Sequence, residues 1–506
     1  MPAKSKACLL SLTIVISILL RLNDLDAKSI WCDEAITILV AEQDALSMLG
    51  DYLNSKSGSL AGSLYQHDVT TALLLHPLTF VSHSEFCMRL PLAIAGILSV
   101  VFIYLLGRTL LSVKVGLLSA FLLAVSPYNV WYSQTARPFA LSAFFTLVSL
   151  YFFLLALKQN QLRHWGVFVV SSTLSIYVSY FGLFVLVAES LYMLLWYRRN
   201  RQMVKRWFLS QAVVFLLLLP VMWLFVSQAA RRTSGTEISV GLPVVISFGS
   251  PWYTFTVGSL LPTPTHLLVA LPGLVVVGLL TIRGILSQRQ QRASLSFLLL
   301  YLFIPYLLSL PVRLTMSTIT LARSLILISP AYYILVALGI LSFQNRKLRV
   351  GFLILLIALA AFCLYEYYTT DIYQGLKLGA NYIRERAQDG DAILHLGGSD
   401  RLTFEYYIRD KVPMYWAWGE ELEAVESGIV EGTIDRLWVV AYRQLSTTER
   451  MMAMYLGEEF ATEQAYQPMD TLLRQMGFIK VEHITFPGEN RLVLRLYARD
   501  WMDVTL

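Results

Sequence analysis

Long apolar runs fill the first 367 residues of this chain and restrict the structures it can form. A helix that crosses about 30 Å of hydrocarbon needs roughly 20 apolar residues, because each residue adds about 1.5 Å. About eleven such runs occur if the longest, His164 to Tyr197, is divided at Tyr180-Phe181-Gly182 so that neither half overshoots the bilayer. They lie near residues 7–22, 91–111, 114–131, 138–157, 164–180, 182–197, 207–227, 264–282, 294–312, 324–342 and 348–367. With 56% apolar and 15% charged residues, the chain is predicted to be a polytopic α-helical membrane protein.

Lysine and arginine residues are concentrated in alternate connections between these predicted spans. Basic residues are retained on the cytoplasmic side of a membrane, so these connections are predicted to lie inside. They are the N-terminus with Lys4 and Lys6 and the connections near 108–114, 158–163, 198–206, 283–292 and 346–349. The first long connection, 23–90, and the residues after 367 are then predicted to lie outside. A cleaved signal peptide is the alternative for the N-terminus, but cleavage would spoil the alternation of charge.

After residue 367 the pattern changes to that of a soluble domain. Acidic residues become frequent, and short amphipathic helices alternate with short apolar strands. Helices are predicted near 379–388, 401–409, 447–456 and 469–476, and strands near 392–396, 437–441, 478–486 and 492–498. We therefore predict a membrane domain over 1–367 and a soluble α/β domain over 368–506. The glycine pattern of a dinucleotide site is absent, which favours a docking or specificity role for this domain.

The four cysteines exclude some classes of site and leave one question open. Cys8 and Cys363 fall in predicted spans, where an apolar thiol is ordinary. Cys32 and Cys87 lie toward the two ends of the first outer connection and could pair in an oxidising compartment, although two unpaired thiols are an equal alternative. No Cys/His spacing typical of structural zinc occurs. No basic surface interleaved with aromatic residues indicates nucleic-acid binding.

A carboxylate pair follows the first predicted span. Trp31-Cys32-Asp33-Glu34 opens the apolar segment 35–41, which reads as a helix lying along the bilayer. Trp31 is of a type that anchors at a membrane interface. Acidic residues at such a boundary are usually only solvated, and we interpret Asp24 and Asp26 in that way. Asp33, by contrast, is a candidate for acid–base chemistry because of the residues that accompany it.

A second candidate segment, Trp131 to Leu141, lies on the same predicted outer side. Pro138 suits the first turn of a helix, where its missing N–H costs nothing, so Arg137 lies just before a helix N-terminus. A guanidinium fork beside free N–H groups suits a phosphate. The alternative is an arginine that extends toward the lipid headgroups.

These segments resemble the GT-C polyprenyl-phosphate-sugar glycosyltransferases, which include protein O-mannosyltransferases and the lipid A aminoarabinose transferases. The resemblance covers nearly all of the chain, including 381–383 and 390–393 in the soluble part. Its four main features, in chain order, are the Asp33-Glu34 pair, the run 84–91 before the second span, Tyr132-Ser133-Gln134 through Arg137-Pro138, and Arg323 with Pro330 at a late span. Their order and their shared side of the membrane make the resemblance specific.

The resemblance implies a reaction and a set of site residues. A sugar carried on a polyprenyl phosphate would be attacked at its anomeric carbon by an acceptor hydroxyl, with inversion and with Asp33 as the base. The acceptor would be a lipid, a glycan or a protein. No metal is required, although a divalent metal is compatible with this chemistry. Glu34, His67 and Asp68 would orient the acceptor or support Asp33 in catalysis. The residues implied in substrate and phosphate binding are Arg137, Arg323, Tyr132 and Gln134.

The chain departs from the family pattern at three places. Thr70-Thr71-Ala72-Leu73 stands where the family has Pro-Pro-Leu-Tyr, Thr135 where it often has Glu, and Ser324 where it has Tyr. The acceptor side is therefore expected to be unusual.

Two other classes of function remain open at this stage. A multi-span transporter or flippase would also have many spans with few buried charges, and Glu189 is the main ionisable residue inside a predicted span. A non-catalytic binder of lipid-linked sugar is the other alternative. An integral protein of a bacterial cytoplasmic membrane, with its N-terminus inside, is the expected setting.

Overall fold

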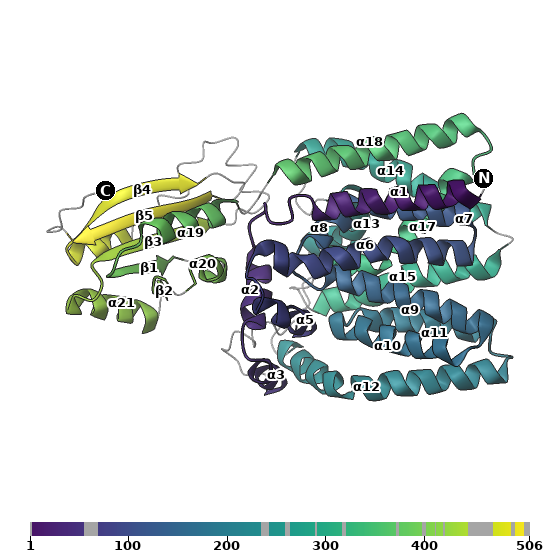
Figure 1. Cartoon of the computed structure of the whole chain (residues 1–506), viewed down its shortest axis with the longest axis horizontal. Coiled ribbons are helices and arrows are strands. Elements are labelled where there is room, and N and C mark those ends of the chain that lie inside the picture. Colours follow the sequence, from purple (N-terminus) through teal and green to yellow (C-terminus); the bar gives the residue numbers. More distant parts are fainter. Residues whose placement is uncertain are drawn as a thin grey trace. The chain divides into compact units, whose positions relative to one another are not determined.

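The computed structural model describes residues 3–54, 69–233, 242–258, 264–288, 291–315, 320–370, 374–396, 401–409, 411–417, 420–443, 469–486 and 491–499 (Figure 1). Contacts between residues divide the chain into two compact units. The first contains Met1–Leu25 and Val40–Tyr368, and the second contains Asp26–Leu39 and Thr369–Leu506. The segment Asp26–Leu39 therefore groups with the C-terminal residues, whereas the sequence analysis placed it in the membrane domain.

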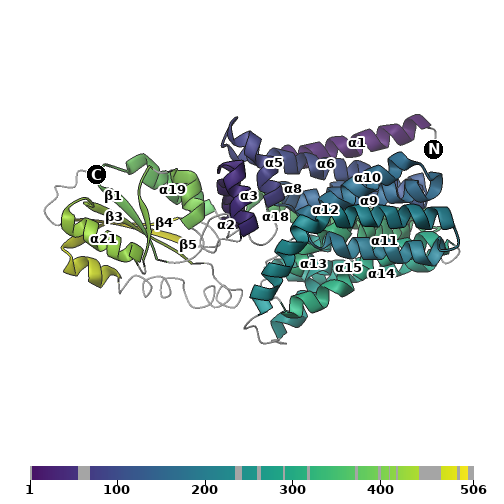
Figure 2. The same ribbon diagram turned by 90° about the horizontal axis from the view of Figure 1, so that it is seen from below.

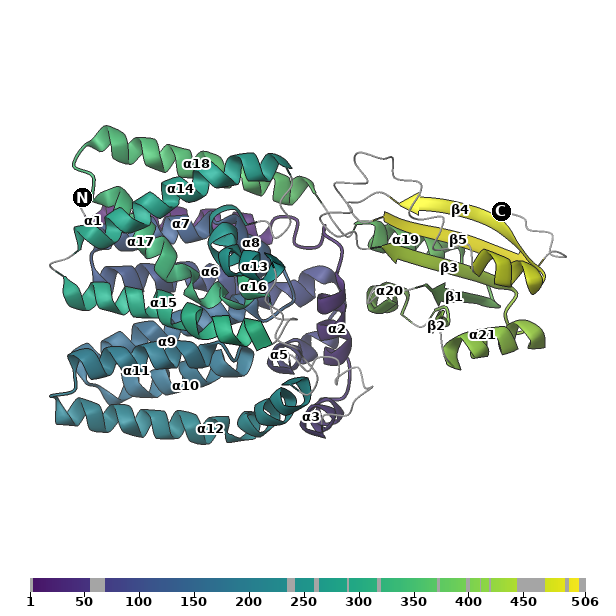
Figure 3. The ribbon, with the colours of Figure 1, turned by 180° about the vertical axis from the view of Figure 1, so that it is seen from behind.

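The first unit is a bundle of helices (Figures 1 and 3). They are α1 (Ala3–Leu22), α3 (Ala45–Asn54), α5 (Val69–Thr79), α6 (Glu85–Leu110), α7 (Val113–Ala124), α8 (Pro127–Ser133), α9 (Phe139–Gln159), α10 (Leu162–Val178), α11 (Gly182–Trp196), α12 (Arg201–Thr233), α13 (Leu242–Val257), α14 (Pro264–Ser287), α15 (Arg292–Thr315), α16 (Leu321–Ser324), the 3-10 helix η1 (Ile326–Ile328), α17 (Ser329–Leu341) and α18 (Arg346–Thr369). The helix α2 (Cys32–Ala41) begins in the second unit and ends in the first.

Seven helices among the described residues are long and apolar enough to cross a membrane, or eight if α7 and α8, bent by 61°, count as one span. A helix or helix pair lies at every predicted span, and the chain breaks between α10 and α11 where the sequence predicted it. Helices such as α11 and α17 are apolar but short. The prediction of a polytopic helical membrane protein is confirmed, while the number of spans stays a prediction.

Between the predicted spans 207–227 and 264–282 the structure has a helix, α13, that was not predicted from the sequence. α13 has only 16 residues, fewer than the roughly 20 needed to cross hydrocarbon, so a search for spans passes over it. It packs against α14, α16 and α8 (Figure 3).

Hydroxyl groups tie α9, α10 and α11 together inside the bundle. Ser149 of α9 donates a hydrogen bond to the buried Glu189 of α11 over 3.0 Å and contacts Ser172 of α10 at 2.8 Å. Thr146 and Ser175 pair in the same way at 2.7 Å. Polar side chains that bond across helices stabilise packing in a membrane. Glu189, the residue that favoured a transporter, is therefore engaged in contacts between helices.

The C-terminal residues of the second unit form a five-stranded sheet with helices, which confirms the predicted α/β character (Figure 2). The elements are α19 (Gln374–Arg386), β1 (Asp391–His395), α20 (Arg401–Ile408), β2 (Met414–Trp416), α21 (Glu420–Glu431), β3 (Arg436–Arg443), β4 (Phe478–Phe486) and β5 (Arg491–Arg499). The strand order is β2-β1-β3-β5-β4. β1 pairs in parallel with β2 and β3, and β5 pairs antiparallel with β3 and β4.

Most predicted elements of this domain are confirmed, including helical structure over residues 469–475. Two elements were not predicted from the sequence: β2, which has only three residues, and α21, whose first turn contains three acidic residues. The predicted helix 447–456 lies outside the described residues.

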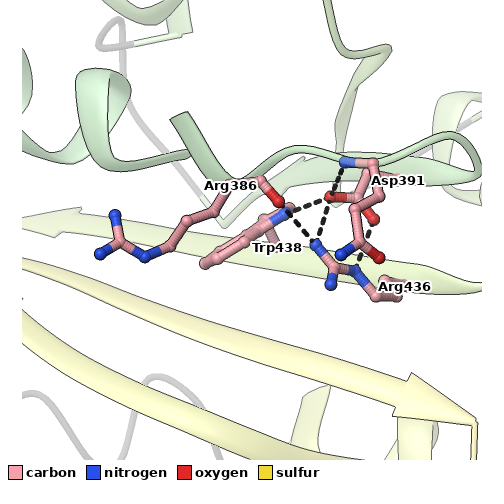
Figure 4. Close-up of polar contacts among 5 residues, drawn as sticks. Arg386, Asp391, Arg436 and Trp438 are labelled. Carbon is pink, nitrogen blue, oxygen red and sulfur yellow. Dashed lines mark hydrogen bonds and ion pairs between the residues drawn. The ribbon is translucent and has the colours of Figure 1, made fainter. Parts of the chain in front are cut away.

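A buried ion pair joins the first residues of β1 and β3 (Figure 4). Asp391 accepts hydrogen bonds from Nε and Nη2 of Arg436, at 2.7 and 2.9 Å, and from the indole N–H of Trp438 at 2.9 Å. Arg436 also donates to the carbonyl of Arg386, the last residue of α19. Asp391 is only 4% exposed, so this network fixes α19 to the sheet in a region shielded from solvent.

Candidate functional site

Arg137 lies in a turn that local sequence signals define. Ser126 caps α8 through its side chain, and Pro127 occupies the first turn. Helix α8 ends at Ser133, Pro138 is the N-cap of α9, and α9 begins at Phe139. The half-buried Arg137 thus directly precedes a helix N-cap, close to the position that the sequence predicted. An unpaired helix N-terminus favours anions.

The aromatic side chains around this turn pack into one cluster. The ring of Tyr132 lies 4.7 Å from that of Phe139 and stacks on Trp131, with ring centres 5.5 Å apart. The guanidinium carbon of Arg137 lies 6.0 Å from the centre of the Phe139 ring. The aromatic cluster connects the end of α8 to the start of α9, which limits the freedom of the turn that carries Arg137.

The structure brings the segment of Arg323 to the same part of the bundle. The hydroxyl of Tyr128, in α8, donates to the carbonyl of Ala322 over 2.5 Å, and Ala322 is the neighbour of Arg323 in α16. α9 also packs against η1, which follows α16. Arg323 is half-buried, as Arg137 is. The helices on either side of Arg137 therefore pack against the segment of Arg323, although the two arginines are far apart in sequence.

Tyr132 and Gln134, the two other predicted substrate-binding residues of this segment, are buried and contact neighbouring helices. Tyr132 is 2% exposed within the aromatic cluster. The amide nitrogen of Gln134 donates to the carbonyls of Leu20, Arg21 and Asn23, and its oxygen accepts from the hydroxyl of Tyr367 over 2.7 Å. Gln134 thus donates hydrogen bonds to backbone carbonyls at the C-terminal end of α1, which have no further helical turn to bond to. The substrate-binding role of these two residues stays a prediction.

Asp33 and Glu34 occupy the first turn of α2, where the helix dipole stabilises negative charge. Asp33 is half-buried and Glu34 only 1% exposed. The hydroxyl of Thr37 donates to the carbonyl of Asp33 over 3.0 Å, which fixes this turn. Asp33 therefore has the access that a base needs, whereas Glu34 is enclosed.

The segment that leads into α2 is held by the C-terminal domain. The N–H of Ile30 donates to the hydroxyl of Tyr407, in α20, over 2.8 Å. Lys28 donates to the carbonyl of Thr370, and Lys377 of α19 donates to the carbonyl of Asp26, both over 3.1 Å. Tyr407 and Lys377 therefore support the segment of Asp33. The sequence analysis missed both, because nothing in the local pattern connects residues 30 and 407.

Two further segments of the family pattern, around Thr70 and Arg89, lie in described parts of the structure. His67 and Asp68 lie outside the described residues. Thr70 of α5 donates to the carbonyl of Tyr177 over 3.1 Å, so this departure from the family pattern stabilises the bundle. Arg89, from the run before the second span, is buried and donates to the carbonyl of Leu25 over 3.0 Å.

Cys8, Cys87 and Cys363 are free thiols in this structure. Within the described part of the chain, no three or more His, Cys, Asp or Glu side chains converge in a way that could hold a metal ion. The expectation that the reaction needs no metal stays a prediction.

Comparison with known proteins agrees with this architecture. Residues 70–224 match the family model described as dolichyl-phosphate-mannose-protein mannosyltransferase. No curated protein sequence matches the chain. Among solved structures, ArnT from Cupriavidus metallidurans in the apo state has 11% identity and a TM-score of 0.56, with 96% of this chain and 97% of that chain covered.

An oligosaccharyltransferase from Archaeoglobus fulgidus, tethered to an acceptor peptide with the NVT sequon, has 12% identity and a TM-score of 0.53. That match covers 87% of this chain and 69% of the other. Such low identities show the fold. Together with the family-model match, they confirm the resemblance and favour a glycosyltransferase over a transporter. The chain is therefore an integral, multi-pass membrane protein with the fold of the GT-C glycosyltransferases.

Proposed function

We propose that this protein is a membrane glycosyltransferase that moves a sugar from a polyprenyl-phosphate donor to an acceptor hydroxyl. The reaction takes place on the extracytoplasmic side and inverts the anomeric centre. Support comes from the fold, from the mannosyltransferase family match over 70–224 and from the placement of the predicted phosphate-binding residues.

The observation that carries the proposal is the contact between the segments of Arg137 and Arg323. The Tyr128 hydroxyl donates to the carbonyl of Ala322, and α9 packs against η1, so the helices on either side of Arg137 pack against the segment that contains Arg323. Two guanidinium groups on one phosphate stabilise the charge that develops on it as the sugar leaves. A transporter for neutral solutes would gain nothing from this pair.

The bond changes follow from these roles. The acceptor hydroxyl gives its proton to the carboxylate of Asp33, and its oxygen forms a bond to the anomeric carbon of the sugar. The bond between that carbon and the phosphate oxygen breaks, and the polyprenyl phosphate leaves with the electron pair. Arg137 and Arg323 bind the leaving phosphate, Glu34 supports Asp33, and His67 and Asp68 orient the acceptor or support Asp33. Lipid phosphate is a good leaving group, so the proposal routes no step through a metal.

The direct test uses purified full-length protein with a polyprenyl-phosphate sugar and candidate acceptors of the lipid, glycan and peptide classes. Appearance of glycosylated acceptor with inverted configuration supports the proposal. Donor binding without transfer to any acceptor class would favour the non-catalytic alternative, and the absence of both would favour a transporter.

Replacement of Arg137 tests the phosphate site. Arg137→Ala removes charge-assisted contacts worth about 1.5–3 kcal/mol, so donor affinity should fall by about one to two orders of magnitude. Arg137→Lys should restore only part of it, because an ammonium lacks the planar fork. The measurement is donor binding to purified variants, with the exposed Arg163, which donates to Gln161, replaced by alanine as a control. If Arg137→Ala binds the donor with normal affinity, Arg137 does not bind the phosphate, and Arg323 becomes the next candidate.

The proposed setting is a bacterial cytoplasmic membrane with the N-terminus inside and the C-terminal domain outside. A reporter that is active only outside the cytoplasm should be active when fused after Leu506 and inactive when fused at Asn200, between α11 and α12. Activity at Asn200 and none at the C-terminus would reverse the orientation and place Asp33 on the wrong side for an external acceptor.

A further inference from the structure

The bend between α7 and α8 leaves backbone groups without their usual partners. The two helices meet at 61° around Ala124 to Pro127, inside the predicted third span. Proline has no N–H, so Pro127 cannot donate to the carbonyl of Leu123 as a helical residue would, and that carbonyl accepts instead a long 3.4 Å backbone hydrogen bond from the N–H of Ser126. The interior of a bilayer offers no water to replace such bonds. The bend therefore needs donors from another part of the protein.

Arg21, the next-to-last residue of α1, supplies these donors. Its Nη2 donates to the carbonyl of Leu123 over 3.2 Å and its Nη1 to that of Ala124 over 2.9 Å. Nη1 also donates to the hydroxyl of Ser17 over 2.9 Å, and Nε donates to the hydroxyl of Ser133 over 3.2 Å. One fork thus holds the end of α7 and the end of α8 together, using four of the five N–H groups of a guanidinium.

Hydrogen bonds between α1 and the end of α8 run in both directions, and the side chains there are tightly packed. Gln134, which follows α8, donates to the carbonyls of Leu20, Arg21 and Asn23. Gly96 of α6 leaves room for the contact, since a Cβ there would lie 2.0 Å from Oγ of Ser133 and 3.0 Å from Nε of Arg21. Arginine near a helix end normally extends to the membrane surface. Arg21 is instead 0% exposed, and its four acceptors are neutral.

We propose that Arg21 is a positioning residue, which holds the α7–α8 bend and thereby sets the turn that carries Arg137. Its link to the donor rests on the proposed function. The inference about the bend itself does not, because it follows from the hydrogen bonds of Arg21. A buried cation is costly and is retained where it has a specific role. Here that role is to donate hydrogen bonds to the carbonyls of Leu123 and Ala124 at the bend, next to the segment proposed to bind phosphate.

Three variants of the full-length protein test the proposal. Arg21→Lys keeps the charge but loses the fork, and Gly96→Ala keeps Arg21 but displaces Ser133. Gly278→Ala is the matched control, because Gly278 also lies in a membrane helix and has no atom within 4 Å of a built Cβ.

The first readout needs no donor. In protein labelled with 5-fluorotryptophan, the fluorine resonance of Trp131 in α8 is assigned by its loss in Trp131→Phe. Arg21→Lys and Gly96→Ala should shift or broaden this resonance, and Gly278→Ala should leave it in place. An unchanged Trp131 resonance in properly inserted Arg21→Lys would overturn the proposal.

The second readout separates positioning from general stability. Arg21→Lys should lower donor affinity by about 3- to 100-fold, the range of coupling within one hydrogen-bond network. In an Arg137→Ala background the same change should have almost no further effect, because the contact it positions is already gone. Equal losses in both backgrounds would overturn the positioning role. Wild-type protein that binds no donor would overturn the proposed function, and the Trp131 resonance would still decide whether Arg21 holds the bend.

Discussion

Asp33→Asn should abolish sugar transfer while leaving the lipid donor bound. Asparagine has the size of aspartate and most of its hydrogen-bonding capacity, but it cannot accept a proton at neutral pH. Loss of a general base typically costs about 10²–10⁴-fold in rate. The proposed phosphate contacts lie on Arg137 and Arg323, so the loss should appear in turnover and not in donor affinity. The measurements are expression level, donor affinity and transfer rate on purified protein.

Glu34→Gln is the matched control for this prediction. Glu34 occupies the same helical turn but is 1% exposed, whereas Asp33 is half-buried, so Glu34 has less access to an acceptor. Its replacement should be milder if it supports Asp33. Equal severity would mean that the two carboxylates act as a unit. Near wild-type transfer by Asp33→Asn would refute the assignment of the base and remove the main reason to prefer an enzyme over a lipid-sugar binder.

Asp391→Ala should destabilise the sheet of the C-terminal domain by about 3–5 kcal/mol, the usual cost of leaving one partner of a buried ion pair alone. The carboxylate accepts hydrogen bonds from Arg436 and Trp438, so its removal leaves a buried guanidinium without its negatively charged partner (Figure 4). Amide hydrogen exchange in β1 and β3 of the intact protein should accelerate by about two to four orders of magnitude.

The same variant should also lower transfer, because Tyr407 and Lys377 of this domain hold the segment that leads into α2. Glu385→Ala is the control, since Glu385 pairs with Arg386 on the surface at 3.8 Å and such pairs contribute about 0–1 kcal/mol. Unchanged exchange in Asp391→Ala would show that the ion pair does not hold the sheet.

Local patterns in the sequence were sufficient to predict several features of the structure. Apolar runs of fixed length give helices at the predicted spans, because a bilayer demands both apolarity and length. The break between α10 and α11, the position of Arg137 before α9, and most strands of the C-terminal domain were also predicted. Each of these depends on a few neighbouring residues, such as a proline at a helix start or an apolar strand between polar turns.

Hydrogen bonds between residues that are far apart in the sequence could be identified only in the folded structure. The N–H of Ile30 donates to the hydroxyl of Tyr407, which is 377 positions away in the sequence. The residues around Ile30 give no indication of this hydrogen bond. The contacts of Arg21 with α7 and of Gln134 with α1 depend in the same way on how helices that are distant in sequence pack together. α13 was missed because its length falls below that of a span, although its packing makes it part of the bundle. Local periodicity records which face of an element is apolar, whereas the partner of a buried polar group is selected only when the whole chain has packed.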